Sequence, residues 1–210
     1  MDYTAAAAQA ADKLLQYSRE QSGWSQCKET DGVLVCWRPS SEFPGGLYKG
    51  DGIIEAAPEH VWECLKPEQG GLRVKWDKNV QAFELVETVS DDITICRTVT
   101  PSAAMKIISP RDFIDVVFIK KYDDGTITSN ATNVLHPDCP PQPGFVRGFN
   151  HPCGCFCVPV PGEPGKTQLL SFFQTDLSGF LPQSVVDSFF PRSMCQFYSN
   201  LKKAVKELTS

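Results

Sequence analysis

The chain has 210 residues, of which 41% are hydrophobic and 21% are charged, and its formal net charge is −5. This length and composition are typical of a globular protein with one core, so we expect a single domain over residues 1–210. The acidic balance and the lack of a basic run argue against nucleic acid as a partner and against permanent docking on an anionic membrane. No apolar run approaches the roughly 18 residues that a membrane span needs.

The N-terminal segment is rich in alanine, the strongest helix former, and predicts a first helix over residues 4–20. Asp2 and the lack of large apolar residues in the alanine run distinguish this segment from an export signal. The nine cysteines are odd in number and scattered along the chain, which is typical of reduced thiols. We therefore expect a cytoplasmic protein.

The rest of the chain predicts mainly strands, with one short helix early and one long helix at the end. Strands are expected at 32–39 and 46–56, a helix at 57–67 and an irregular segment at 72–80. Turn-forming residues and two proline-rich loops then separate six further strands. These are predicted at residues 82–90, 93–100, 111–122, 126–135, 145–158 and 167–177.

The C-terminal segment, about residues 182–208, has apolar positions that recur at threes and fours, which predicts a long amphipathic helix. The order of elements is helix, strands, helix, many antiparallel strands and a long helix. This order predicts an α+β fold in which a curved antiparallel sheet packs against the C-terminal helix.

The faces of three strands indicate what the sheet packs against. Thr98 and Thr100 share one face of the strand 93–100, and Ser129 lies among other small residues on one face of the strand 126–135. The last strand is apolar on both faces, so its sheet needs two covers. Small, weakly polar side chains are typical of a wall that lines an apolar-ligand pocket. The alternative is an ordinary solvent-facing antiparallel sheet.

The segment 101–110 is a long loop between strands that carries Met105, Ile107 and Ile108. A loop with this much apolar surface packs on another part of the molecule or lies at a site. Arg111 and Asp112 follow it directly. The ordinary interpretation is that they end the strand as a local surface ion pair, and the alternative is that Arg111 anchors the strand below the loop.

The stretch FNHPCGCFC places His151 close to Cys153, Cys155 and Cys157. Structural zinc sites usually combine two pairs of closely spaced ligands, and no second pair is present here. We therefore expect no metal. Alternating cysteines in a strand share one face, and they are interpreted as small buried thiols on either the cavity side or the outer side.

No sequence motif for a cofactor, a phosphate or a catalytic nucleophile is present, so we expect no cofactor and no enzymatic activity. Arg73 lies between two apolar residues, Leu72 and Val74. Inside a pocket its guanidinium would bind a carboxylate or sulfonate well. The alternative is an ordinary surface arginine.

Four motifs occur in the order VKWDKNV, SPRDF, GFVRGFNHP and KTQLLSFFQTDLSGFLPQSVV, followed by a C-terminal helix. In this combination and order the chain resembles the START (StAR-related lipid transfer) domain family from end to end. The resemblance implies a helix-grip fold, in which a curved antiparallel sheet and a long C-terminal helix enclose a hydrophobic tunnel. It also implies a monomeric, non-enzymatic carrier that takes one lipid between membranes, with cholesterol and bile acids as associated ligands.

The best-known sterol-binding members of this family place a carboxylate and an arginine as an ion pair in the tunnel. The matching positions here are Thr98 and Val117, so that pair is absent. The resemblance then implies that Thr98, Thr100 or Ser129 contacts a sterol hydroxyl, and that Arg73 receives an acidic ligand.

A bile acid is therefore favoured, with cholesterol or an oxysterol as alternatives. The 101–110 loop and the C-terminal helix are expected to gate the tunnel, with transient contact to membranes. The remaining alternative is a helix-grip enzyme, similar to cyclases or hydrolases, that acts on a hydrophobic substrate. The residues expected to line or gate the mouth are Met105, Ile107, Ile108, Val185 and Phe189.

Overall fold

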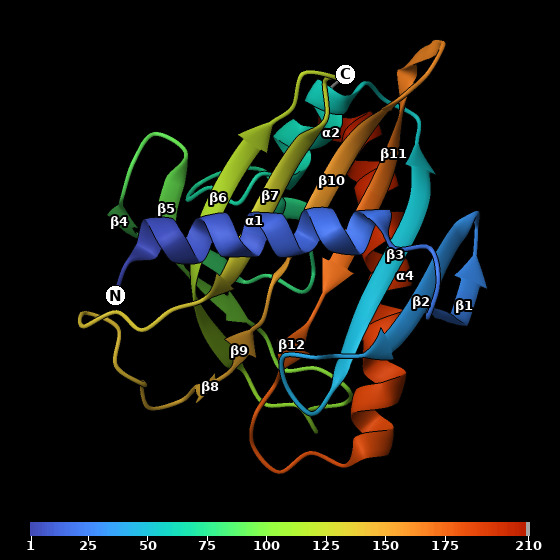
Figure 1. Cartoon of the computed structure of the whole chain (residues 1–210). Coiled ribbons are helices and arrows are strands. Elements are labelled where there is room, and N and C mark those ends of the chain that lie inside the picture. Colours follow the sequence, from blue (N-terminus) through green and yellow to red (C-terminus); the bar gives the residue numbers. More distant parts are fainter. Residues whose placement is uncertain (209–210) are drawn as a thin grey trace.

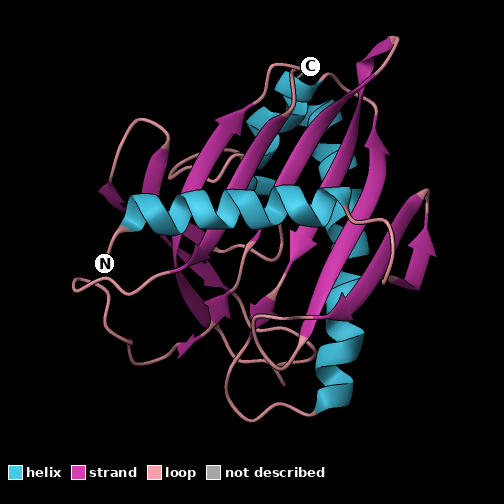
Figure 2. Cartoon of the chain, in the orientation of Figure 1, coloured by secondary structure: helices cyan, strands magenta, loops and turns pink. Residues whose placement is uncertain are grey.

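The computed structural model describes residues 1–208 and shows a large curved sheet with helices on both faces (Figure 1 and Figure 2). The helices are α1 (Tyr3–Arg19), α2 (Pro58–Leu65), α3 (Arg73–Trp76) and α4 (Gln183–Leu208). The strands are β1 (Ser25–Thr30), β2 (Val33–Pro39), β3 (Gly46–Ile54), β4 (Ala82–Thr88), β5 (Ile93–Thr100), β6 (Arg111–Lys121), β7 (Ile127–Asn133), β8 (Val146–Arg147), β9 (Phe149–Asn150), β10 (Cys153–Val160), β11 (Glu163–Phe173) and β12 (Thr175–Asp176).

The main sheet runs in the order β1-β2-β3-β11-β10-β7-β6-β5-β4, and every neighbouring pair along this path is antiparallel. The short strand β8 pairs in parallel with β6, and β12 pairs with β9 in a small second sheet. The helix-grip α+β fold expected from the sequence is confirmed. The pairing of β3 with β11 joins the N-terminal strands to the strands that come last in the chain.

The two covers that the last strand requires are α1 and α4, which lie on opposite faces of the sheet (Figure 1). α1 begins after Asp2, whose carboxylate accepts a hydrogen bond from the Ala5 backbone N–H at 3.0 Å. Its buried stripe includes Leu14 and Tyr17, which pack with Phe156 and other outer-face residues. The outer face of the sheet is therefore closed by an ordinary hydrophobic core.

α4 lies closest to the sheet at β3, where two glycines leave room for an aromatic ring. The Tyr198 side chain is fully buried, and its hydroxyl donates a hydrogen bond to the Leu169 backbone oxygen at 2.7 Å. A Cβ atom on Gly50 would lie 2.8 Å from the Tyr198 ring, and one on Gly52 would lie 3.2 Å from it. Bare backbone at these two positions lets α4 close one end of the grip.

The structure differs from the predicted strands in three places. The strand predicted over 167–177 is divided into β11, which begins earlier at Glu163, and β12. The single strand predicted over 145–158 is divided into β8, β9 and β10. At Gly148 a Cβ atom would lie 2.3 Å from the Phe113 ring, and Gly154 has a φ of 155° with Ser129 backbone oxygen 1.8 Å from its would-be Cβ. Neither position has room for a Cβ atom. The interruptions themselves lie at Gly148, between β8 and β9, and at His151-Pro152, between β9 and β10. The edge strand β1 was not predicted, because its sequence SQCKET is polar and mostly exposed.

Candidate ligand cavity

A cavity of about 250 Å³ lies between α4 and the concave face of the sheet. β5, β6, β7 and β10 form its wall, and α3 and the loop before β6 close its ends. Most of the surface is apolar or aromatic, which suits a hydrophobic ligand. The apolar lining includes Phe113, Val117, Phe173, Phe190, Met194 and Phe197.

Seven of the nine predicted site residues lie on this cavity wall. They are Arg73, Thr98, Thr100, Ile108, Val117, Ser129 and Phe189. The other two lie outside the wall: Met105 is 95% exposed at the tip of its loop, and Val185 is half-buried near the start of α4. The strand alternation therefore brings the small polar residues together, as the cavity interpretation expects.

The alternating cysteines of β10 lie on the cavity face of the sheet. Cys153 and Cys155 line the cavity, and Cys157 lies on the same face, buried in the core beneath α4. Burial raises the pKa of the Cys153 and Cys157 thiols well above their usual range. All nine cysteines of the chain are free thiols. The cavity cysteines are small, protonated wall residues.

His151 takes no part in a metal site with these cysteines. Its ring stacks on Phe43, with the centroids 4.7 Å apart and the planes 7° apart. Within the described part of the chain, no three His, Cys, Asp or Glu side chains are arranged to hold a metal ion.

Arg73 reaches the cavity from α3, but its charge already has a partner. Its Nε donates to Asp77 Oδ2 at 2.8 Å, and Nη1 donates to the Leu65 backbone oxygen at 3.0 Å. Asp77 is only 3% exposed, so this is a buried ion pair. Nη2 has no hydrogen-bond partner among residues 1–208. Arg73 therefore offers one free edge of a largely neutralised guanidinium.

A second polar cluster on the wall was missed by the sequence analysis. Asp115 on β6 is 5% exposed and lies between Phe113 and Val117 on the cavity face. Its Oδ2 accepts a hydrogen bond from Asn150 Nδ2 at 2.8 Å. Thr175 Oγ1 in turn donates to Asn150 Oδ1 at 2.7 Å. The sequence contained a signal for Asp115, because alternation along the strand places it on the same face as Val117.

The environment of Asp115 favours its protonated form. Burial raises the pKa of this carboxyl to about 7, although the hydrogen bond from Asn150 acts in the opposite direction. Its other oxygen, Oδ1, is buried and has no hydrogen-bond partner in residues 1–208. The cavity thus contains one titratable group that is only half satisfied by the protein.

The loop before β6, residues 101–110 and here named the mouth loop, contributes Ala103 and Ile108 to the cavity lining. Two backbone hydrogen bonds join Ala103 and Ile108, at 2.8 and 3.1 Å, and close the loop into a tight turn. Ala104, Met105 and Lys106 all have positive φ values, between 50° and 68°, which are strained for residues with a Cβ. Ile108 is buried against the cavity, whereas Met105 and Ile107 point to solvent.

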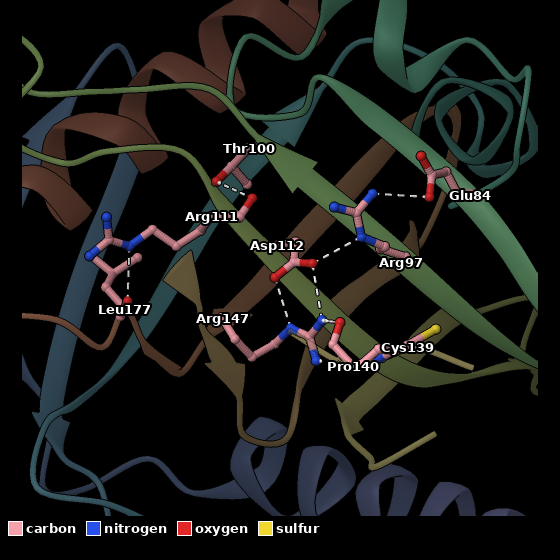
Figure 3. Close-up of polar contacts among 9 residues, drawn as sticks. All are labelled: Glu84, Arg97, Thr100, Arg111, Asp112, Cys139, Pro140, Arg147 and Leu177. Atoms are coloured by element: carbon pink, nitrogen blue, oxygen red, sulfur yellow. Dashed lines mark hydrogen bonds and ion pairs between the residues drawn. The ribbon is translucent and has the colours of Figure 1, made fainter. Parts of the chain in front are cut away.

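Arg111 holds this mouth in place, and it does not pair with Asp112 (Figure 3). Its guanidinium is buried and donates to the backbone oxygens of Ser109, Leu177 and Ser178 at 2.7–2.9 Å. Burial lowers the pKa of Arg111. The local surface ion pair was wrong, and the alternative of an anchoring arginine agrees with these contacts. One side chain thereby ties the mouth loop to the segment that precedes α4.

Asp112 lies on the outer face of β6 between two other arginines (Figure 3). Arg147 donates to both of its oxygens, at 2.8 and 3.1 Å, and Arg97 Nε donates to Oδ2 at 2.9 Å. Arg97 Nη1 also contacts Glu84 at 3.1 Å. Alternation along the strand explains the result, because adjacent residues of a strand point to opposite faces.

The comparisons with known proteins agree with this architecture. A family model described as START domain matches residues 4–210. The chain belongs to the START domain family. StAR-related lipid transfer protein 5 from Mus musculus and from Homo sapiens are each 66% identical to this START domain over 197 residues, which cover 94% of this chain and 92% of each relative.

A solved structure of the human StAR-related lipid transfer protein 5 matches this START domain with a TM-score of 0.95 at 61% identity. The match covers 99% of this chain and 98% of that chain. Human StAR-related lipid transfer protein 6 is 37% identical over 206 residues, which cover 98% of this chain and 93% of that protein. None of the helices in residues 1–208 has the length and apolarity that crossing a membrane requires.

Proposed function

We propose that this START domain binds one steroid-like lipid in the cavity beneath α4 and carries it between membranes without changing it chemically. The observation that carries the proposal is the largely apolar cavity of about 250 Å³ with a few separate polar groups on its wall. The names of the relatives, which are lipid transfer proteins, agree with it. Burial of the apolar surface of the ligand supplies the binding free energy, at about 25 cal/mol per Å².

A bile acid is the favoured ligand, with cholesterol or an oxysterol as alternatives. The free Nη2 edge of Arg73 suits a carboxylate, and Thr98, Thr100 and Ser129 suit hydroxyl groups. Asp77 reduces the attraction of Arg73 for an anion, because it compensates the guanidinium charge.

Entry of the ligand requires the mouth to open. The cavity volume of about 250 Å³ lies just below the roughly 300–1,000 Å³ that is usual for ligand pockets. The 101–110 loop, with Ile108 on the wall, and the start of α4, with Val185 and Phe189, form the gate. The exposed side chains of Met105 and Ile107 make transient contact with a membrane during exchange.

The carrier acts as a cytosolic monomer and needs no metal or cofactor. Its nine free thiols suit a reducing compartment. Ligand recovered after incubation is expected to have an unchanged mass, and a chemically altered ligand would instead support the enzyme alternative.

The ligand class is tested by titrating a labelled bile acid against three proteins: wild type, Asp77→Asn, and the double variant Arg73→Met with Asp77→Asn. Asp77→Asn frees the charge of Arg73 and retains the side-chain oxygen that accepts from the Asn79 backbone N–H. It is expected to bind the anion about tenfold more tightly, because a hydrogen bond to a charged group contributes about 1.5–3 kcal/mol. The double variant removes both charges together, so it leaves no unpaired buried ion and is expected to bind more weakly than wild type.

Equal affinities of the three proteins would remove Arg73 from the binding site. Failure of wild type to bind any bile acid, cholesterol or oxysterol would overturn the ligand class itself. Thermal unfolding of each protein serves as the control for folding.

A further inference from the structure

Two carboxylates lie on the cavity wall within residues 1–208, and they differ in their ion-pair and hydrogen-bond partners. Asp77 is paired with Arg73 at 2.8 Å. Asp115 has no cationic partner within ion-pair distance and receives one hydrogen bond, from Asn150. A buried carboxylate with an unsatisfied oxygen destabilises the fold, because burial removes hydration that nothing replaces. The free oxygen of Asp115 is therefore available to a partner that the protein does not supply.

The same strand, β6, carries another buried aspartate whose carboxylate oxygens both accept hydrogen bonds. Asp112, on the outer face of β6, accepts three hydrogen bonds from Arg97 and Arg147. Asp115, three residues later on the cavity face, has none from an arginine. The two aspartates differ in the face they occupy, because Asp115 lines the cavity and Asp112 does not.

The position of Asp115 is held by a chain of neutral hydrogen bonds. Thr175 Oγ1 donates to Asn150 Oδ1 at 2.7 Å, so the Asn150 amide has to direct its Nδ2 donor toward Asp115 Oδ2. The pairing of Thr175 with Asn150 between β12 and β9 fixes both side chains. Asn133 Nδ2 donates to the Asn150 backbone oxygen at 2.7 Å and adds support from β7. Oδ2 is thereby occupied, and Oδ1 is the single open acceptor.

We propose that Asp115 Oδ1 accepts a hydrogen bond from a hydroxyl group of the bound lipid, so that the cavity selects hydroxylated steroids over matched steroids that lack this hydroxyl. The proposal rests on the proposed function, because it concerns the same cavity. One open acceptor matches one hydroxyl donor, whereas an ammonium group has three donors to satisfy. The neighbours of Asp115 on β6, Phe113 and Val117, are apolar and suit the ring system that carries the hydroxyl.

The experiment measures Kd values for 5β-cholanic acid and for its mono-hydroxy and mono-oxo derivatives at ring carbons 3, 7 and 12. Measurements are made at pH 8, where the Asp115 carboxyl, with its pKa of about 7, is mostly ionised. A carboxylate accepts from a hydroxyl and cannot donate to a ketone. At one ring position wild type is expected to bind the hydroxy acid at least about tenfold more tightly than both the oxo acid and the unsubstituted acid.

Two substitutions test the role of Asp115. Asp115→Leu removes the acceptor, so the preference for that hydroxyl is expected to fall to near onefold while the unsubstituted acid still binds. Asp115→Asn keeps an oxygen for Asn150 Nδ2 and turns an amide donor toward the cavity. It is therefore expected to gain affinity for the oxo acid, a reversal that a purely structural role would not produce. Thr94→Val removes a hydroxyl from β5 outside the cavity lining, and it is expected to leave the preference at that position unchanged.

The outcomes separate this proposal from the proposed function. Wild type that binds the acids with no preference at any ring position overturns the role of Asp115 and leaves the carrier function standing. The role of Asp115 is also overturned, and the carrier function again left standing, if Asp115→Asn ranks the affinities of the hydroxy and oxo acids as wild type does. Wild type that binds none of the acids, and no cholesterol or oxysterol, overturns the carrier function. If Asp115→Leu fails to fold, the near-isosteric Asp115→Asn still decides the question.

Discussion

Asp115 and Asp112 lie on opposite faces of β6, and their carboxyl pKa values are shifted in opposite directions. Burial raises the pKa of Asp115 to about 7, because no cation faces its carboxyl. Burial also acts to raise the pKa of Asp112, but the hydrogen bonds from Arg147 and Arg97 outweigh it and leave the pKa below its usual value. The two groups therefore change the free energy of unfolding in opposite directions as the pH changes.

The pH dependence of stability is expected to reveal both groups. The pKa of Asp115 is about 7 in the folded chain and 3.8 in ordinary surroundings. Between these values the folded state holds more protons, so this group lowers stability as pH rises. Relative to wild type, Asp115→Asn should gain stability from pH 4 to pH 7, with a slope of at most about 1.4 kcal/mol per pH unit. Urea unfolding at several pH values measures the gain.

Asp112→Asn is the matched control on the same strand, and its effect is opposite in sign. Its folded pKa lies below 3.8, so its contribution is present at neutral pH and is lost as pH falls through the folded value. Breaking this buried pair should cost about 3–5 kcal/mol at pH 7, with a smaller loss in acid. A flat difference between Asp115→Asn and wild type across pH 4–7 would contradict the assignment of Asp115.

The sequence predicted part of the site and missed the rest for a definite reason. Thr98 and Ser129 were predicted on the wall, because small residues that alternate along a strand indicate a lined face. Val117 was predicted from the resemblance to the START family. Asp115 was not predicted, since a lone acidic residue in a strand resembles a solvent-facing one until its face is assigned. The contacts of Arg111 with Leu177 and Ser178 join distant segments, so no local pattern identifies them. Asp77 follows Arg73 by four residues, a helical spacing that could have indicated this pair.

At the scale of elements, the grip depends on how closely α4 approaches β3. Tyr198 is fully buried and donates to the Leu169 backbone oxygen, with the ring resting on the bare backbone of Gly50. Along the same helix, Phe189 and Phe190 line the cavity instead. α4 therefore joins the sheet at one end and covers the cavity at the other.

Gly50→Ala is expected to destabilise this contact, because the added Cβ would lie 2.8 Å from the Tyr198 ring. Overpacking of this kind costs about 1–3 kcal/mol, measured by urea unfolding. Gly165→Ala on β11 is the matched control, since nothing lies within 4 Å of its Cβ position. It should change stability by less than about 0.5 kcal/mol. Equal stability of the two variants would argue against a tight contact at Gly50.

The elements themselves were predicted well where one regular pattern runs unbroken. The strand expected at 93–100 is observed over the same residues as β5, and the helix expected at about 182–208 is observed as α4. The segment 145–158 was predicted wrongly as one strand, because it is interrupted at Gly148, which packs against the Phe113 ring of β6, and at His151-Pro152. Such close approaches are tertiary and leave no periodic signal.

At the scale of the whole molecule, exposed apolar side chains gather on segments that Arg111 anchors. Met105 and Ile107 lie on the mouth loop, and Phe180 lies fully exposed before α4. Arg111 binds backbone oxygens of both segments. The opposite end of the molecule carries the end of β3, with Ile53 exposed there (Figure 1).

Replacing Met105 and Ile107 by serine is expected to slow lipid transfer between vesicles while leaving ligand affinity unchanged. Each apolar side chain that enters a membrane contributes about 1.5–3 kcal/mol, so a reduction of at least about tenfold is expected in the transfer rate. Ile53→Ser removes a comparable exposed side chain far from the mouth and should transfer at the wild-type rate. Unchanged transfer by the loop variant would show that this loop does not contact the membrane.

The pairing of β3 with β11 has a consequence for how the chain acquires its shape. The N-terminal strand β3 remains without its second neighbour until residues 163–173 have left the ribosome, and α4 follows later still. Such contacts between distant parts of the sequence make folding slow. The entropy cost of closing a long loop is incurred before any stabilising contact forms. Until then β3 presents an open edge to other chains. The cavity is thus completed only after α4 has been synthesised, so a ligand can be enclosed only once that helix has left the ribosome.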